Sequence, residues 1–408
     1  MMNSNAYVLG LAPWLALLSL LTLSGCATLD GIEPNTRPQL LVQQLENSPL
    51  KEALQSCDTS PFAATPFSIS HRGAPLGYPE HTAEGYQAAA AMGAGVIECD
   101  VTFTRDNQLV CRHSQCDLHS TTNILQTPLA ITCRVPFKGA DGDEPASAQC
   151  CTSDITQAEF LTLCGRPDRV DPQATTVEGY LSPATATPAG LEGLKAPACG
   201  TLLTHQASIE LIDKLGADFT PELKSPMVDM PHRGMSQQAY ADKLIRDYEQ
   251  AGIDPGRVYP QSFNPSDVAW WIQSHPAFAD QAVYLDPRGF RPDFQPTLAG
   301  MQALFDQGFR ILAPPIPVLL EVEQGALVAT EYAKLARAAG LQLITWTFEA
   351  GVATDPNNRW HKPFQEIIKQ EGDMLQVLQA LDKQANVIGV FSDWPGTVTY
   401  YANCRKEN

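Results

Sequence analysis

The sequence predicts an α/β fold, a TIM-like (β/α)8 barrel that carries a cysteine-rich insertion. Apolar, β-branched segments alternate with helix-like segments, and several of the latter are followed directly by glycine, a common signal for the end of a helix. The alternation is interrupted once, over residues 120–200. With 408 residues, 44% of them hydrophobic, the chain can bury one large barrel core.

Nine segments have the composition of strands, one more than an eight-stranded barrel needs. They are Phe67–Ser70, Gly95–Thr104, Leu109–His113, Asp218–Leu223, Val258–Phe263, Ala282–Asp286, Arg310–Pro314, Leu341–Phe348 and Val387–Ser392. Only four residues separate Thr104 from Leu109, whereas a parallel crossover needs about a dozen. We therefore expect Leu109–His113 to run antiparallel, which leaves eight parallel strands. If Thr104 pairs with Leu109, His113 lies opposite Asp100.

Helix-like segments fill most of the intervals between these strands, which implies βαβ units. They are Thr82–Met92, Gln206–Leu215, Ser236–Ala251, Pro265–Ser274, Thr297–Gln307, Thr330–Ala339 and Asp373–Gln384. The insertion at 120–200 is rich in Pro, Gly, Thr and Cys and contains one helix-like stretch, Thr156–Cys164. Because long insertions after barrel strands usually lie over the active-site face, we interpret it as a disulfide-stapled cap that shapes the access of substrate. The alternative is a decoration remote from the site.

The N-terminus has the features of an export signal. The first 25 residues carry no charged side chain, and their apolar stretch ends in Leu23-Ser24-Gly25-Cys26. This ending resembles the lipobox of bacterial lipoproteins, although no Lys or Arg precedes the apolar stretch. The resemblance predicts a signal peptide over 1–26 and lipidation of Cys26. The polar, proline-punctuated stretch that follows predicts a tether and docking segment over 27–63, and the alternation of strands and helices places the barrel over 64–404. A plain secretory signal or an uncleaved anchor is the alternative.

The predicted location follows from the same features. A lipidated Cys26 followed by Ala27 resembles the pattern of an exported periplasmic or cell-surface lipoprotein held in the outer membrane. Apart from Cys26 the chain has ten cysteines, an even number that favours disulfides in an exported protein. Zinc binding is the competing interpretation, but no Cys-x-x-Cys pairs with matching spacing are present. A formal net charge of -18 argues against nucleic acid as a partner.

Two carboxylates in one predicted strand indicate a metal site. Glu98 and Asp100 are two residues apart, so they share one face of the strand while Cys99 points to the other. Inside a barrel, unpaired carboxylates are costly, and a cation is the expected partner. Oxygen ligands favour Ca2+ or Mg2+ over zinc. A surface strand with solvated acids is the alternative. Glu222 and Lys224 repeat the spacing at another strand end, where we expect one to complete the metal shell and the other to attract an anionic group of the substrate. A plain ion pair is the alternative.

Two histidines lie at predicted strand ends that carry these charges. His71-Arg72-Gly73 ends the first strand; histidine suits proton transfer near neutral pH, arginine binds phosphate, and glycine allows a tight turn. His113 is the second histidine. Two histidines beside one phosphorus atom fit a general base and a general acid on opposite sides of an in-line displacement. A structural role for each histidine is the alternative.

These residues together resemble the glycerophosphodiester phosphodiesterase family, over about Pro66 to Pro395. The motifs that carry the resemblance are His71-Arg72-Gly73, Pro79-Glu80-His81-Thr82, Gly93-Ala94, Ile97-Glu98-Cys99-Asp100-Val101, Asp106, Leu109-Val110, His113, Thr121-Thr122-Asn123, Glu222-Leu223-Lys224, Gln261-Ser262-Phe263, Trp346 and Gly389-Val390-Phe391-Ser392-Asp393-Trp394-Pro395. Two positions depart from the pattern: Ser114 follows His113 where the family usually has Asp, and His81 replaces the commoner Asn.

The resemblance implies a TIM-like barrel that hydrolyses glycerophosphodiesters to glycerol 3-phosphate and an alcohol, by way of a cyclic phosphate formed by the substrate's own glycerol hydroxyl. It implies His71 and His113 as the acid–base pair, Glu98, Asp100 and Glu222 as ligands of a divalent cation, Arg72 and Lys224 as phosphate-binding residues, and Trp346 in the pocket. Two alternatives remain open. One is a phospholipase acting on membrane lipids, with Trp270-Trp271 as an apolar rim; the other is a surface-binding lipoprotein on an inactive barrel.

Overall fold

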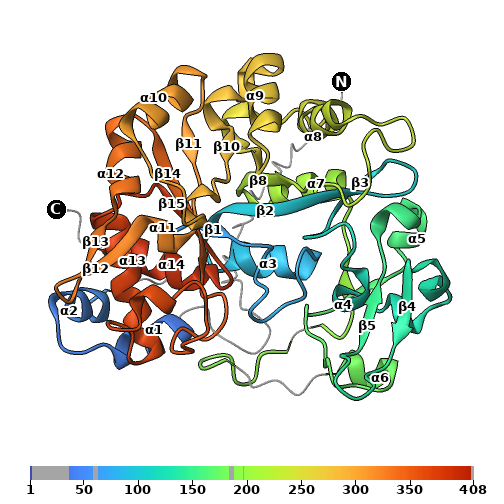
Figure 1. Cartoon of the computed structure of the whole chain (residues 1–408), viewed down its shortest axis with the longest axis horizontal. Helices are drawn as coiled ribbons and strands as arrows, with labels where there is room; N and C mark the ends of the chain where they lie inside the picture. Colours follow the sequence, from blue (N-terminus) through green and yellow to red (C-terminus); the bar gives the residue numbers. More distant parts are fainter. Residues whose placement is uncertain (2–35, 58–62, 183–187, 196, 406–408) are drawn as a thin grey trace.

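The computed structural model describes residues 1, 36–57, 63–182, 188–195 and 197–405. Its centre is a closed barrel of parallel strands, as the sequence predicts (Figure 1). The barrel strands, in chain order, are β1 (Thr65–Ser70), β2 (Ala94–Phe103), β8 (Asp218–Leu223), β9 (Gln261–Ser262), β10 (Val283–Tyr284), β11 (Ile311–Leu312), β14 (Gln342–Phe348) and β15 (Gly389–Ser392). They neighbour one another in the order β1-β15-β14-β11-β10-β9-β8-β2, and the pairing of β1 with β2 closes the ring.

The surplus strand β3 (Leu109–Cys111) runs antiparallel beside β2, as predicted. Its register differs by one residue from the predicted one, because Leu109 pairs with Phe103 rather than with Thr104. Thr104 instead closes the turn with Gln108. Its N–H donates to the Gln108 carbonyl oxygen at 2.9 Å, and its Oγ1 accepts from the Gln108 N–H at 3.1 Å.

This shift changes the residue that faces the metal-binding strand. The prediction that His113 lies opposite Asp100 is wrong, since the pairing of Val101 with Cys111 places Arg112 there. The Arg112 N–H donates to the Asp100 carbonyl oxygen at 2.7 Å. His113 follows one residue later, beyond the end of the paired segment.

Helices surround the barrel and connect its strands (Figure 1). They are α3 (Ala83–Ala91), α7 (His205–Leu215), α8 (Gln237–Ala251), α9 (Pro265–Ser274), α10 (Leu298–Asp306), α12 (Glu331–Ala338), α13 (Met374–Lys383) and α14 (Pro395–Cys404). The sequence predicts all but α14, within two residues at each end. The side chains of Thr82, Thr204 and Ser236 accept a backbone N–H of the first turn of α3, α7 and α8. A short helix α11 (Ile316–Leu319) and the hairpin β12 (Leu320–Glu323) with β13 (Ala326–Ala329) lie between β11 and α12.

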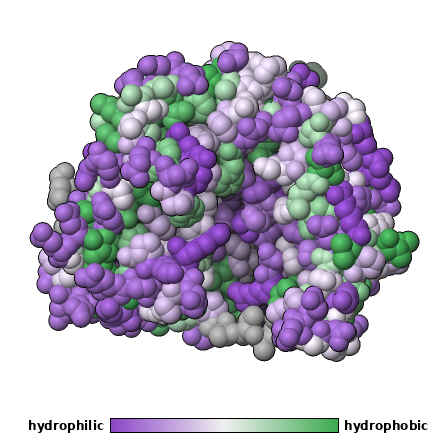
Figure 2. Space-filling view, viewed as in Figure 1, coloured by the Kyte–Doolittle hydropathy of each residue, from purple (hydrophilic) through white to green (hydrophobic). Residues whose placement is uncertain are grey.

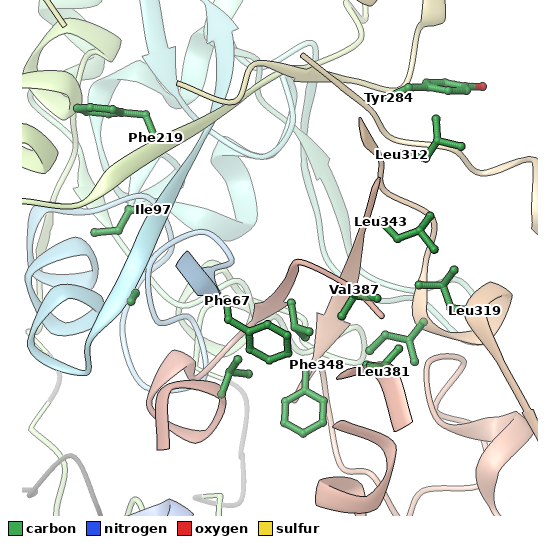
Figure 3. Packing of buried hydrophobic residues seen from close by; sticks show 14 of the residues in the cluster. Phe67, Ile97, Phe219, Tyr284, Leu312, Leu319, Leu343, Phe348, Leu381 and Val387 are labelled. Atoms are coloured by element: carbon green, nitrogen blue, oxygen red, sulfur yellow. The ribbon is translucent and has the colours of Figure 1, made fainter. Parts of the chain in front are cut away.

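The apolar core has two layers, one outside and one inside the ring of strands. Outward-facing strand residues such as Ile97, Phe219 and Leu343 pack with the helices in the main cluster (Figure 3). A second cluster fills the space between the inner faces of the strands. It contains Ile69, Val96, Val283, Leu285, Ile311, Ala313, Ile344 and Phe391. Because these side chains fill the barrel, a ligand can only bind at an end of it.

The N-terminal segment docks against the barrel through two helices, α1 (Thr36–Gln44) and α2 (Pro49–Gln55). The fit of α1 is close. A Cβ atom at Gly372 would lie 2.2 Å from the Leu41 carbonyl oxygen. A disulfide between Cys57 and Cys404 joins the residues after α2 to the last helix. Cys26 and the rest of the predicted signal lie outside the described residues, and no described helix has the length and apolar character needed to span a membrane.

The insertion forms a lobe beside the barrel with its own apolar cluster (Figure 1). Its elements, with those at its edges, are α4 (Leu118–Thr121), β4 (Val135–Lys138), β5 (Ser147–Gln149), α5 (Gln157–Phe160), β6 (Cys164–Gly165), α6 (Val177–Tyr180) and β7 (Gly200–Thr201). The prediction of a helix over Thr156–Cys164 is wrong in length. Only α5 is α-helical, because the chain extends at Cys164 to pair with β7.

Disulfides hold the insertion and its neighbours. Besides the Cys57–Cys404 bond they are Cys99–Cys111, Cys116–Cys151, Cys133–Cys150 and Cys164–Cys199. Every cysteine in the described part of the chain is therefore paired. This outcome confirms the expectation of disulfides and leaves no described cysteine free to bind zinc.

Candidate active site

A polar pocket of about 350 Å3 opens where several barrel strands end. It is lined by His71, Arg72, Glu98, His113, Glu222, Lys224, Gln261, Phe263, Leu285, Trp346, Thr347, Ala350, Arg359, Trp360, Phe391 and Asp393. Figure 2 shows a hydrophilic hollow near the middle of one face of the molecule. The carboxyl ends of barrel strands are the usual place for an active site in this fold.

Three buried carboxylates form the floor of the site. Glu98 and Asp100 lie on one face of β2, and Asp100 is in register with Glu222 of the neighbouring strand β8. One oxygen from each of the three lies within 4.8 Å of the others. Cys99 points away from them and is bonded to Cys111, as the alternation of a strand requires.

Each carboxylate is held by a specific partner. Glu98 accepts from the Gln261 side-chain amide at 2.9 Å and from the Arg72 backbone N–H at 2.8 Å. Lys224 Nζ lies 2.7 Å from Glu222 Oε1. His81 Nε2 lies 2.9 Å from Asp100 Oδ2. His81, which departs from the family pattern, thus orients a carboxylate of the floor.

The charges of the three buried carboxylates favour a bound cation. Burial and the neighbouring carboxylates raise the pKa of Glu98 well above its usual value, and burial raises the pKa of Glu222 to about 7. Asp100 Oδ1 is buried and has no hydrogen-bond partner among the described residues. Three converging carboxylates, one of which has an oxygen without a hydrogen-bond partner, suit a hard divalent ion. The residues present therefore fit the divalent cation that the resemblance implies.

The two predicted histidines stand in different surroundings. His71 follows β1, and its Nδ1 lies 2.5 Å from Oδ1 of Asp393, which follows β15. This contact orients the ring and leaves Nε2 as the nitrogen available to a substrate. His113 lines the same pocket. Burial, together with Lys224 and Arg72, lowers the pKa of His113 to about 2, so its ring is neutral near pH 7.

Arg72 is placed by a tight turn at the end of β1. Its backbone has a φ of +54°, and Gly73 follows with a φ of +95°. A Cβ atom on Gly73 would lie 3.1 Å from the backbone of Gly85, so glycine fits both the conformation and the close approach. The Arg72 guanidinium donates to Glu80 Oε2 at 3.1 Å. It lies 3.7 Å from Asp100 Oδ2.

Aromatic residues form another wall of the pocket. The Trp346 ring contacts Phe263 edge to face, with centroids 5.5 Å apart, and Trp360 at 5.2 Å. The Trp346 indole N–H donates to the Ala313 carbonyl oxygen at 2.8 Å, which fixes its orientation. The structure therefore places the predicted pocket tryptophan against the same cavity as the histidines.

The structure brings the predicted site residues together. Seven of them line the pocket, and Asp100 lies in the carboxylate cluster beside it. Sequence reasoning gave no role to Asp393 or Gln261, although both lie at strand ends, where the argument that singled out His71 applies equally. It also passed over Arg359 and Trp360, which belong to a long loop with no strand pattern. No described residue of 120–200 is among the residues that line the pocket.

Comparisons with known proteins agree with this geometry. The sequence pattern of the glycerophosphoryl diester phosphodiesterase family matches residues 71–397. A protein of Arthroderma benhamiae named "Extracellular protein" is 38% identical over 247 residues, 58% of this chain and 98% of that one. A Mycobacterium tuberculosis protein provisionally named glycerophosphodiester phosphodiesterase 1 is 49% identical over 54 residues, 13% of this chain and 20% of that one.

A solved structure shows the same fold at lower identity. It comes from Silicibacter pomeroyi and is provisionally named a glycerophosphoryl diester phosphodiesterase. Its TM-score is 0.54 at 19% sequence identity, and the match covers 83% of this chain and 92% of that one. The family pattern spans most of the chain and includes every pocket residue named in the sequence argument. The chain therefore belongs to the glycerophosphoryl diester phosphodiesterase family.

Proposed function

We propose that the protein hydrolyses glycerophosphodiesters to sn-glycerol 3-phosphate and an alcohol at a site that holds a divalent cation. The observation that carries the proposal is the meeting of three buried carboxylates, two histidines and two basic side chains around one 350 Å3 pocket. Carboxylates that hold a cation, bases that move protons and cations that hold phosphate are the groups that phosphodiester hydrolysis needs.

Glu98, Asp100 and Glu222 are the proposed ligands, and their oxygen atoms favour Ca2+ or Mg2+. When bound, the ion would supply positive charge that stabilises the extra negative charge of the transition state. Gln261 and His81 hold Glu98 and Asp100 in place through their side chains. These contacts orient the ligands before the ion binds.

Arg72 and Lys224 are the proposed phosphate-binding residues. Both line the pocket, and each is already anchored by a carboxylate, Arg72 by Glu80 and Lys224 by Glu222. Anchored cations keep their direction when the substrate enters, so they add little ordering cost on binding. The planar guanidinium can donate two parallel hydrogen bonds to phosphate oxygens, and the ammonium acts as a point charge.

The two histidines are proposed to move the protons. A hydroxyl of the substrate's own glycerol attacks phosphorus, and the bond to the alcohol breaks on the opposite side. His113 takes the hydroxyl proton. Burial and the positive charges of Lys224 and Arg72 lower the pKa of His113, so its ring is neutral and can accept a proton. His71, oriented by Asp393, gives a proton to the leaving oxygen. Water then opens the cyclic phosphate with the two roles reversed.

We further propose that the protein works outside the cytoplasm, held to a membrane by lipid on Cys26 and placed in the outer membrane of the cell envelope. Five disulfides support an oxidising compartment, and one relative bears the name "Extracellular protein". The Leu-Ser-Gly-Cys ending supports lipidation. The lobe at 120–200 is proposed as a cap beside the pocket.

Trp270 and Trp271 do not form the exposed apolar rim that the phospholipase alternative requires. Trp271 is fully buried, and its indole N–H donates to the Ala241 carbonyl oxygen at 3.1 Å. The Trp270 indole N–H donates to Asp242 Oδ1 at 2.8 Å. Both residues therefore pack α9 against α8 on the outside of the barrel.

The test is release of sn-glycerol 3-phosphate from glycerophosphocholine by the purified full-length protein, with Ca2+, with Mg2+ and with chelator. We expect release that needs the metal and is lost in Glu98→Ala/Asp100→Ala. Glu321→Ala/Glu323→Ala is the control, because this exposed pair has the same spacing on β12. Absence of release under every metal from a folded protein would point instead to a lipid substrate or a binding role.

A further inference from the structure

The pocket contains one cation that the proposed reaction does not use. Arg359 lines the pocket, yet its guanidinium makes no ion pair or hydrogen bond with any residue that the structure describes. It lies over the ring of Trp360, with the guanidinium carbon 4.2 Å from the ring centroid. Arg359 is therefore a positive charge without a carboxylate partner, unlike Arg72 and Lys224 in the same pocket.

The loop that carries Arg359 is held to the end of β14 by Asn358. The Asn358 side-chain amide donates to the carbonyl oxygens of Ala350 at 2.8 Å and Val352 at 3.0 Å. Its side-chain oxygen accepts from the Trp360 backbone N–H at 3.0 Å. Asn358 thus ties the loop to the residues that follow the strand that supplies Trp346. This bracing presents Arg359 to the pocket in a defined position.

The neighbouring wall is aromatic. Trp360 contacts Trp346, which contacts Phe263, and the Phe290 ring lies 6.4 Å from that of Trp360. Aromatic faces of this kind attract a quaternary ammonium group such as that of choline. Here the guanidinium of Arg359 already covers a face of Trp360, and its charge repels a second cation.

The variable part of the substrate is a partner available to this charge, since no described residue pairs with it. All glycerophosphodiesters share a neutral glycerol and one phosphate, and they differ in the esterified alcohol. Arg72 and Lys224 are the phosphate-binding candidates, which leaves the additional arginine available to contact the alcohol. An anionic group there would gain a charge-assisted hydrogen bond from Arg359, and a cationic one would be disfavoured.

We propose that Arg359 determines specificity by favouring glycerophosphodiesters whose alcohol carries a carboxylate or another anionic group. The inference rests on the proposed function, since it concerns the alcohol released in that reaction. The preferred class includes the serine ester. The ethanolamine ester, which differs from it only by lacking the carboxylate, is a poorer substrate, and so is the choline ester.

The test compares kcat/KM for glycerophosphoserine, glycerophosphoethanolamine and glycerophosphocholine in the full chain and in Arg359→Glu. We expect the substitution to lower kcat/KM for the serine ester by about tenfold, mainly through KM, and to raise it for the choline ester. Arg359→Met, which keeps an apolar stem over Trp360, should abolish the preference without inverting it. Lys214→Glu on α7 is the control for the change in net charge, because Lys214 is exposed and away from the pocket.

Two results separate this inference from the proposed function. An equal change for all three esters, or an unchanged ratio in Arg359→Glu, would overturn the role of Arg359 while hydrolysis stands. If the wild-type protein hydrolyses none of the esters, the proposed function fails, and calorimetric binding of the same three esters still decides the inference. Binding of the serine ester that Arg359→Glu weakens relative to the choline ester would support it, and an unchanged ratio of the dissociation constants would overturn it.

Discussion

Arg37 and Glu349 form a buried ion pair between residues 312 positions apart: Arg37 Nε donates to Glu349 Oε1 at 2.7 Å. Arg37 belongs to α1, and Glu349 follows β14 directly, one residue before Ala350 of the pocket. A second Arg37 nitrogen donates to the Ala189 carbonyl oxygen at 2.5 Å. The ion pair therefore connects the N-terminal segment to the residue that follows β14. Through its second contact, Arg37 also connects the N-terminal segment to the insertion.

Replacing Arg37 by Met should lower the free energy of unfolding by about 3–5 kcal/mol, because it leaves the Glu349 carboxylate buried without its partner. Chemical denaturation at pH 7 measures the change. The double variant Arg37→Met/Glu349→Gln removes both charges and should recover part of the loss. Equal stability of Arg37→Met and the wild-type protein would show that the pair contributes nothing to the docking of α1.

The disulfides should contribute more to stability the longer the loops they close, in proportion to the logarithm of loop length. The Cys57–Cys404 bond spans 347 residues and the Cys99–Cys111 bond spans 12. The loss of loop entropy in the unfolded chain predicts about 6 kcal/mol for the first and about 3 kcal/mol for the second. Unfolding of Cys57→Ala/Cys404→Ala and Cys99→Ala/Cys111→Ala in urea compares them. A larger loss for the shorter loop would contradict the entropic explanation.

The barrel could be predicted from the sequence because the patterns that mark its strands and helices are local. Strand and helix periods recur within 10 to 20 residues, and the four residues after Thr104 were enough to assign β3 as antiparallel. The register of that hairpin was not predictable in the same way. The register depends on whether Thr104 pairs as a strand residue or closes the turn with Gln108. Two hydrogen bonds between Thr104 and Gln108 favour the turn.

Features that depend on contacts between distant parts of the chain stayed beyond sequence reasoning. The pairing of Cys57 with Cys404 and of Arg37 with Glu349 joins parts of the chain that are 347 and 312 residues apart, and no local pattern marks either pair. Arg359 lies in a loop where spacing carries no information about direction. His71 could be identified because it ends a strand, and strand ends in a barrel meet at one edge. Glu98 could be identified because it shares one face of a strand with Asp100.

Metal binding should stabilise the folded protein independently of activity. Three carboxylates that repel one another in the metal-free site gain a shared counter-ion, and saturation at about 100 times the dissociation constant adds about 2.7 kcal/mol. The measurement is the shift of the unfolding temperature with Ca2+ and with Mg2+, relative to chelator. Glu98→Gln/Asp100→Asn should lose the shift, and Glu321→Gln/Glu323→Gln should keep it. A shift that survives the first variant would place the ion elsewhere.

The assignment of His113 as base and His71 as acid predicts different responses to the leaving group. A 4-nitrophenyl ester of glycerol 3-phosphate releases nitrophenolate, which needs no proton, so the acid becomes dispensable. His71→Asn should therefore lose about 100-fold or more in the single-turnover rate of choline release from glycerophosphocholine, but much less in the single-turnover rate of nitrophenolate release. His113→Asn should be impaired equally on both, because the attacking hydroxyl is unchanged. The reverse pattern would exchange the two roles, and equal losses by both variants on both esters would indicate that neither histidine protonates the leaving oxygen.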